Sequence, residues 1–274
     1  MAANIAPVTA PLSSHVIDAD VHTDATPDAV AHFNEHGWLL TQTLDAAGIS
    51  ELRSWVDEVS DWPDNGDGWL HHREMTDNGP VLCRSENLVP FHDGFRRLLT
   101  TGSLLEVASA LLGETAVLYK EKINYKLPGG AGYAPHQDAP AYPFVASHVS
   151  CMVAIDDSNL HNGCLEVVSG MHHELLPTDD KGCVRADVAA GFDWAAVPVA
   201  AGQTLWFHSR TPHRSGANHS STARRALYPT YNALAEGDLR EDYYAQKLAA
   251  FAADDGSGAH VQVSLIGDFQ GRAV

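Results

Sequence analysis

The hydrophobic pattern of this chain changes period at Gly113, and that change constrains the possible folds more than any other feature. Before Gly113, apolar residues recur at helical spacing within residues 45–59 and 95–112, and residues 29–40 suggest a short helix that runs into a first strand after a break at Gly37. After it, apolar and polar residues alternate as they do in strands, with turn-forming Gly and Asn residues between the segments. The alternating segments are residues 116–126, 148–156, 164–168, 203–208 and 224–232. Helices followed by many strands predict an α+β, mainly β domain with a sandwich or barrel centre and flanking helices.

The same pattern indicates how the chain divides. At 274 residues the chain is long enough for one large domain or two small ones, and no linker interrupts it. Residues 1–25 are rich in Ala, Pro, Ser and Thr, which predicts a flexible N-terminal arm before a single domain of residues 26–274. Residues 62–80 are polar and rich in Gly, which predicts a long loop. Such a loop is either a lid over a site or a plain surface excursion, and the sequence leaves both open.

The charge of the chain excludes several classes of partner. The formal net charge is -18, which argues against binding to nucleic acid or to anionic membranes, although a small anionic ligand can still find a locally basic site. No apolar run is long enough to span a bilayer, and the N-terminus lacks the pattern of a secretory signal. The four cysteines show no Cys-x-x-Cys spacing, which favours reduced thiols in a cytoplasmic protein. The oligomeric state does not follow from the sequence.

A candidate metal site begins at His136-Gln137-Asp138. Side chains two apart on a strand point to the same face, so His136 and Asp138 can aim at a common point while Gln137 faces away. His213 follows the predicted strand 203–208 and offers a second imidazole from the same half of the chain. Two His and one carboxylate on one side of a metal leave positions open, as a non-haem Fe(II) oxygenase requires for O2 and a cosubstrate.

Two further residues near His213 suit a dicarboxylate cosubstrate. Arg224 follows His213 by 11 residues and begins a predicted strand, and its guanidinium can hold a carboxylate through two hydrogen bonds. The hydroxyl of Ser215 can add another bond. Arg225 is the rival of Arg224, and only one of the two should face the site because neighbours on a strand point in opposite directions.

With these residues, the chain resembles the phytanoyl-CoA dioxygenase family of Fe(II)/2-oxoglutarate oxygenases, which includes the ectoine hydroxylases. The resemblance covers about 110 residues, from roughly 120 to 232. The segments that carry it are INYK (123–126), HQD (136–138), NGCLE (162–166), SGMH (169–172) and HRSGAN (213–218), which runs on to Arg224. Together these segments are specific for the family but not for a substrate.

The resemblance implies a double-stranded β-helix, or cupin-like jelly roll, whose iron is held by His136, Asp138 and His213. It also implies that Ser215 and Arg224 bind the far carboxylate of 2-oxoglutarate and that Asn124 approaches the cosubstrate from another strand. The implied reaction uses O2, converts 2-oxoglutarate to succinate and CO2, and hydroxylates a substrate. The presence of Asp138 favours hydroxylation over halogenation, because the halogenases of this superfamily lack that carboxylate.

The substrate is less constrained. Lys120 and Lys122 share a strand face with Asn124, so they either face water or line a polar cavity suited to a carboxylate, phosphate or phosphonate. Tyr142 and His148 follow the metal pair closely and are further candidates for substrate contact. The run LYKEKINYK (118–126) is also similar to the bacterial members that hydroxylate 2-aminoethylphosphonate. We therefore expect a small zwitterionic or anionic substrate, with an aminophosphonate favoured over an amino acid, a betaine or a natural-product intermediate.

Two alternatives lie outside the oxygenases. A metal-dependent isomerase or hydrolase on a cupin-like barrel would use the triad without needing Arg224 or Ser215. A binding or sensor protein could keep the fold without catalysis, although an intact triad argues against it.

Overall fold

Two β-sheets make up the centre of the computed structural model, which describes residues 13, 15–64, 68–77, 79–142, 145–253 and 263–274. The larger sheet has the strand order β1 (Val21–His22), β2 (Trp38–Gln42), β10 (Gln203–His208), β7 (His148–Ala154), β12 (Arg224–Ala233), β5 (Ala116–Lys126), β4 (Gly79–Glu86) and β3 (Leu70–Thr76). The smaller sheet has the order β6 (Tyr133–His136), β11 (His213–Ser215), β8 (Leu165–Val167) and β9 (Ala195–Val197). All named pairs are antiparallel except β1 with β2.

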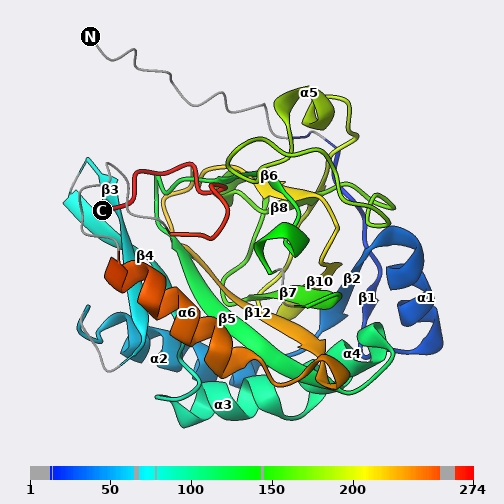
Figure 1. Cartoon of the computed structure of the whole chain (residues 1–274), viewed down its shortest axis with the longest axis horizontal. Helices are drawn as coiled ribbons and strands as arrows, with labels where there is room; N and C mark the ends of the chain where they lie inside the picture. Colours follow the sequence, from blue (N-terminus) through cyan, green and yellow to red (C-terminus); the bar gives the residue numbers. More distant parts are fainter. Residues whose placement is uncertain (1–12, 14, 65–67, 78, 143–144, 254–262) are drawn as a thin grey trace.

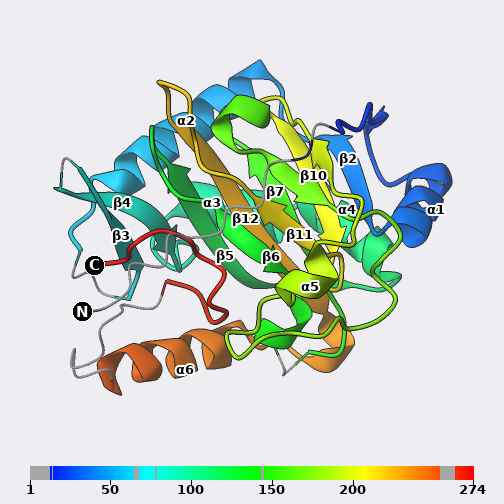
Figure 2. The same ribbon diagram turned by 90° about the horizontal axis from the view of Figure 1, so that it is seen from above.

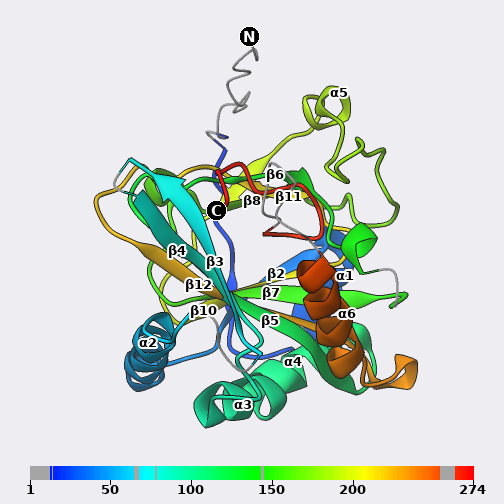
Figure 3. The same ribbon diagram turned by 60° about the vertical axis from the view of Figure 1, so that its left-hand side comes forward.

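Several helices cover the face of the large sheet that is turned away from the small one, whereas α5 (Ala186–Ala189) lies on the side of the small sheet (Figure 3). The helices are α1 (Pro27–His36), α2 (Ala46–Ser60), α3 (Asp93–Thr100), α4 (Ser103–Leu112), α5 (Ala186–Ala189) and α6 (Arg240–Ala253), with short 3-10 turns at Ala139–Ala141, Leu160–Asn162 and Leu234–Glu236. α2, α3 and α4 lie together beneath the large sheet, and α6 lies against β5 (Figure 1). The result is a mixed α and β architecture dominated by sheet, as the change of period predicted.

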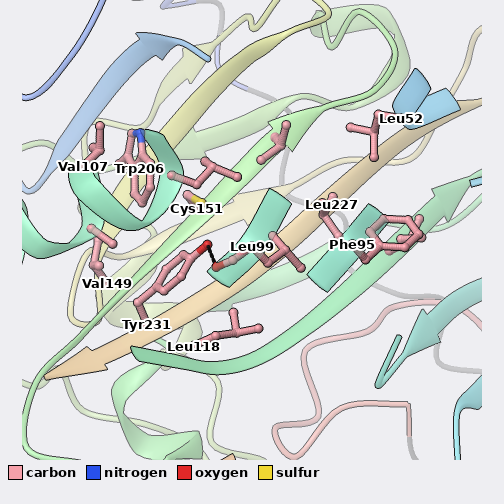
Figure 4. Close-up of a cluster of buried hydrophobic side chains, with 14 of the residues drawn as sticks. Leu52, Phe95, Leu99, Val107, Leu118, Val149, Cys151, Trp206, Leu227 and Tyr231 are labelled. Atoms are coloured by element: carbon pink, nitrogen blue, oxygen red, sulfur yellow. Dashed lines mark hydrogen bonds between the residues drawn. The ribbon is translucent and has the colours of Figure 1, made fainter. Parts of the chain in front are cut away.

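Strand alternation divides the apolar residues between two cores. On β7, Cys151 and Val153 face the helices, whereas Met152 and Ala154 face the small sheet. The helix-side core is shown in Figure 4, where the Tyr231 hydroxyl donates a hydrogen bond to the Leu99 carbonyl at 3.0 Å. The sheet-side core leaves the space between the two sheets apolar at one end and polar at the other, where the candidate site lies.

Two sequence predictions about local structure were wrong. Much of the loop expected at 62–80 is a β-hairpin in which β3 pairs with β4, although residues 65–67 and 78 lie outside the described part. The helix expected at 95–112 is two helices, because Thr101 is extended and Gly102 takes a left-handed conformation with φ of 68°. Gly37 and Gly113 end α1 and α4 in the left-handed conformation, with φ of 79° and 74°.

The N-terminal arm expected over residues 1–25 is only partly described, because residues 1–12 and 14 lie outside the described part. The part that is described is joined to the sheets. The Ile17 amide donates to the Ala196 carbonyl at 2.9 Å, and β1 pairs with β2 in parallel.

The C-terminal strap, which we define as residues 263–274, lies over one end of the space between the sheets (Figure 2). It is bonded to the edge strands of both sheets. The Gln270 amide donates to the Gly132 carbonyl next to β6 at 3.0 Å, and the Met75 amide on β3 donates to the Arg272 carbonyl at 2.7 Å.

Candidate active site

The three predicted metal ligands converge in the structure. His136 ends β6 and lies directly opposite His213 on β11, while Asp138 follows β6 by two residues. The Asp138 Oδ1 atom is 3.8 Å from His136 Nε2 and 3.9 Å from His213 Nε2. Two donors that each bind one ion at about 2.1 Å lie at most about 4.2 Å apart, so these spacings fit a shared metal ion. Among the described residues, these three form the group of His, Cys, Asp and Glu side chains able to hold one.

The two imidazoles are held in the tautomer that a metal requires. His136 Nδ1 donates to the Ala134 carbonyl at 2.8 Å, and His213 Nδ1 donates to the Thr211 carbonyl at 3.0 Å. Each Nε2 therefore keeps its lone pair free. Burial lowers the pKa of His213 to about 4, so this ring is neutral at physiological pH and ready to bind a cation.

The carboxylate ligand is oriented by a serine that the sequence analysis did not identify. Ser150 Oγ donates to Asp138 Oδ2 at 2.7 Å and lies 2.9 Å from the Thr230 hydroxyl. Burial alone would raise the pKa of Asp138, but the electrostatic influence of His213 and Lys120 outweighs burial and lowers that pKa below its usual range. Ser150 could have been found from the sequence, because the alternation of residues 148–156 places it on the inward face of the strand.

Removal of this serine hydroxyl should weaken metal binding. For Ser150→Ala we expect the affinity for Fe(II) to fall about 10-fold, because groups behind a metal ligand typically contribute 10- to 100-fold. Anaerobic titration with Fe(II) measures the change. Ser158→Ala is the matched control, because Ser158 is buried and its hydroxyl has no hydrogen-bond partner among the described residues. Equal affinities for Ser150→Ala and the unmodified protein would contradict this role.

The lysine face of β5 points into the space between the sheets, where Lys120 is buried and Lys122 is half-buried. Lys120 is 4% exposed and, among the described residues, neither its ammonium nor that of Lys122 makes a hydrogen bond or an ion pair. Lys120 Nζ lies 4.4 Å from the centre of the Tyr142 ring, and Lys122 Nζ lies 5.6 Å from that of Tyr228. Burial lowers the pKa of Lys120 to about 8 and that of Lys122 well below its ordinary value. Both amines are therefore placed to gain from an anionic ligand.

Two adjoining cavities meet at the triad, and Lys120 and Lys122 line both. We call them the Tyr142 cavity and the Tyr228 cavity after a lining residue that each has to itself. Both cavities are small and are lined largely by polar and charged side chains, which suits a small polar ligand. His136, Asp138 and Asp268 also line both cavities, so a ligand in either one lies next to the metal position.

Arg224 and Arg225 point in opposite directions, as strand alternation predicted. Arg225 reaches outward to Asp156 at 2.8 Å and to Asp57 at 2.6 Å. Arg224 is 1% exposed and has no carboxylate partner in the described part of the chain, and its Nη1 lies 3.4 Å from the Tyr228 hydroxyl. A buried guanidinium behind the wall of the Tyr228 cavity is suited to an anion that enters from that cavity.

The other two candidate cosubstrate residues already bond to cations. Ser215 Oγ accepts a hydrogen bond from Lys126 Nζ at 2.9 Å, and Asn124 Oδ1 accepts one from Arg84 Nε at 3.0 Å. Neither Lys126 nor Arg84 was singled out from the sequence. Lys126 lies on the same inward face of β5 as Lys120, and this shared face could have identified it.

The remaining substrate candidates separate. Tyr142 lines the cavity that bears its name. His148 is 1% exposed, packs its ring edge-on against Tyr142 with 5.2 Å between ring centres, and is absent from the lining of both cavities. Gln137 points away from the triad, as predicted, and its amide nitrogen donates to the Glu174 carbonyl at 3.0 Å.

The comparisons with known proteins agree with this geometry. The family model for phytanoyl-CoA dioxygenase (PhyH) matches residues 33–226, a range that holds the triad, Asn124, Ser215 and Arg224. The chain belongs to the phytanoyl-CoA dioxygenase family. It is therefore a 2-oxoglutarate-dependent dioxygenase, and the alternatives of a cupin-like isomerase or a binding protein are set aside.

Two curated relatives match most of the chain. A methylphosphonate hydroxylase of Gimesia maris is 46% identical over 92% of this chain and 98% of its own length. A 2-aminoethylphosphonate dioxygenase of the uncultured bacterium HF130_AEPn_1 is 38% identical over 82% of this chain and 88% of its own. The crystal structure of EctD from S. alaskensis with 2-oxoglutarate and 5-hydroxyectoine has the same fold, with a TM-score of 0.67 and 21% identity over 81% of this chain and 83% of that one.

The described helices contain no segment that is both long and apolar enough to cross a membrane.

Proposed function

We propose that this dioxygenase hydroxylates a small organophosphonate, using Fe(II), O2 and 2-oxoglutarate and releasing succinate and CO2. The observation that carries the proposal is the pair of inward ammonium groups of Lys120 and Lys122, which have no acceptor in the described protein and lie beside the triad. A phosphonate offers oxygens and negative charge to both amines at once. Two relatives are named for phosphonate substrates, methylphosphonate and 2-aminoethylphosphonate, which supports the same class here.

In this proposal the iron is bound by His136, Asp138 and His213, whose spacing and protonation fit a divalent cation. Bound iron supplies the activation of O2 that side chains alone cannot perform. The residues 26–274 form one catalytic domain, and the two facing sheets correspond to the jelly roll expected for this family.

The cosubstrate lies in the Tyr228 cavity. Arg224 holds its far carboxylate, with the Tyr228 hydroxyl as the group that the carboxylate displaces or shares. Ser215 and Asn124 complete the polar surroundings, each already oriented by a buried cation. A dicarboxylate matches this cavity because its two ends can meet the metal and the guanidinium at the same time.

The substrate lies in the Tyr142 cavity, with its phosphonate on Lys120 and Lys122. A phosphonate placed there holds the neighbouring carbon close to the triad, which both cavities share. An amino acid or a betaine remains a second candidate class from the sequence. Two unpaired amines favour the phosphonate, because its charge exceeds that of one carboxylate.

Substrate affinity should depend on the protonation of Lys120. Its pKa is lowered to about 8 by burial, so the ammonium is present below that value and is lost as the pH rises through it. We therefore expect the KM for a phosphonate to rise above about pH 8 while the KM for 2-oxoglutarate changes less. Lys120→Met should raise the KM for the phosphonate about 10- to 100-fold, the loss typical of a hydrogen bond to a charged group. A KM that is the same for Lys120→Met and the unmodified protein would contradict this placement.

The experiment that tests the function has two steps. Anaerobic Fe(II) and 2-oxoglutarate should first produce the visible charge-transfer band of a chelated 2-oxo acid. Succinate release is then measured in air with phosphonates, amino acids and betaines. We expect release to be stimulated by phosphonates. Stimulation only by amino acids or betaines would overturn the substrate class while leaving the family assignment intact.

A further inference from the structure

Asp268 is a buried carboxylate beside the triad that the proposed mechanism does not use. It comes from the C-terminal strap, is 3% exposed and lines both cavities. Its Oδ2 atom is 3.3 Å from His136 Nε2, and its Oδ1 atom has no hydrogen-bond partner among the described residues. Its backbone is fixed, because the Ala134 amide on β6 donates to its carbonyl at 2.5 Å. The carboxylate is thus held at the cavity by the strap.

Among the described residues, no group donates to Oδ1 of this carboxylate, and its Oδ2 atom lies next to His136 Nε2. In the neutral ring with its hydrogen on Nδ1, His136 Nε2 presents a lone pair to Asp268 and donates no hydrogen bond to it. An unpaired buried carboxylate costs free energy that a bound donor would recover. We therefore expect a hydrogen-bond donor of the ligand to face the Asp268 carboxylate in this part of the cavity.

The two kinds of charge come from different parts of the fold. The lysines project from β5 in the large sheet, and Asp268 projects from the strap that is bonded to β6 in the small sheet. A ligand that spans the cavity meets ammonium groups from one element and a carboxylate from another. The ligand that complements both is a zwitterion with an anionic and a cationic end.

We propose that Asp268 is a specificity-determining residue that receives the amino group of a 2-aminoalkylphosphonate whose phosphonate lies on Lys120 and Lys122. This inference rests on the proposed function and narrows it from phosphonates in general to those that carry a cationic group. The carbon between the two ends then lies at the boundary of the two cavities, beside His136 and Asp138.

The test compares two phosphonates of the same size. 2-Aminoethylphosphonate and n-propylphosphonate differ in that a methyl group replaces the ammonium group. Their binding is measured anaerobically from the change that each causes in the charge-transfer band of the Fe(II) and 2-oxoglutarate complex, and their kcat/KM from succinate release. For the unmodified protein we expect at least a 30-fold preference for the aminophosphonate, as for a buried charge pair.

Asp268→Asn should remove that preference. The affinity for 2-aminoethylphosphonate should fall, while the affinities for n-propylphosphonate and for Fe(II) should not change. Glu74→Gln is the matched control, because Glu74 is a buried carboxylate near the strap that lines neither cavity. It should keep the preference. Asp268→Ser is a second variant that shortens the side chain if the amide disturbs folding.

Three results would overturn the inference. The unmodified protein binding both phosphonates equally well would show that no cationic end is recognised. If Asp268→Asn lowers the affinity for both phosphonates and for Fe(II) to a similar extent, Asp268 is part of the metal site. If neither of the two phosphonates binds or stimulates succinate release, the proposed function itself is overturned, and the inference fails with it.

Discussion

His213→Ala is expected to abolish Fe(II) binding and substrate-dependent succinate release. His213 is 4% exposed, its Nε2 faces Asp138, and its ring is fixed through the Thr211 carbonyl. Its removal leaves only two ligands from the triad. We therefore expect a loss greater than the roughly 10- to 100-fold typical when a group behind a ligand is removed. Anaerobic Fe(II) titration and the charge-transfer band with 2-oxoglutarate measure the loss independently of turnover.

The matched control for this prediction is His208→Asn. His208 lies on β10, is half-buried and accepts a hydrogen bond from the Arg210 amide, but it lines neither cavity. Its replacement should leave Fe(II) binding intact. If His213→Ala folds, binds Fe(II) as tightly as the unmodified protein and retains the band, the three-ligand site is wrong.

Arg224→Gln should lower the affinity for 2-oxoglutarate more than any other substitution in the cosubstrate pocket. Its guanidinium is buried without a carboxylate partner in the described chain, so the cosubstrate would supply its counterion. Loss of one partner of a buried charge pair costs about 2–5 kcal/mol of binding free energy. Titration of the charge-transfer band with 2-oxoglutarate measures this directly, and the Fe(II) affinity without cosubstrate should not change.

Arg225→Gln is the control for this experiment, because Arg225 is the sequence neighbour on the opposite face of the same strand. It should lose its ion pairs with Asp156 and Asp57 and keep its affinity for 2-oxoglutarate. If the two variants bind 2-oxoglutarate equally, or if Arg225→Gln loses more affinity, the assignment of the carboxylate anchor to Arg224 fails.

The metal triad could be predicted because its geometry is mostly local. A two-residue spacing on one strand relates His136 to Asp138, and one antiparallel pairing brings His213 opposite His136. The choice between Arg224 and Arg225 was likewise a matter of alternation. These features need only the period of a strand and one long-range pairing.

The alternation of β5 shows where local rules end. The sequence placed Leu118 on the same face as Lys120, but Leu118 packs into the helix-side core while Lys120 faces the cavities. The pairing with β12 shifts register here, because Thr230 pairs with Lys120 and the next residue, Tyr231, pairs with Leu118, so that β5 contains one extra residue. The break between α3 and α4 had a similar cause, because a single Gly102 interrupts an otherwise helical pattern.

The position of Asp268 at the site could not be predicted from the sequence. It lies 130 residues beyond Asp138, in a segment without hydrophobic periodicity, and reaches the site only because the strap crosses between the two sheets.

The strand at residues 70–76 was missed for a related reason. Their alternation involves His, Arg and Glu rather than apolar residues, and it becomes a strand through pairing with β4.

The central claim is that this protein transfers one oxygen atom of O2 to a phosphonate while it oxidises 2-oxoglutarate to succinate and CO2. The most direct test supplies isotopically labelled O2, Fe(II) and 2-oxoglutarate with 2-aminoethylphosphonate and analyses the products by mass spectrometry and phosphorus NMR. The account predicts a hydroxylated phosphonate with the label in its new hydroxyl group, and one labelled succinate for each. Succinate formed at the same rate without the phosphonate, with the phosphonate recovered unchanged, would contradict it.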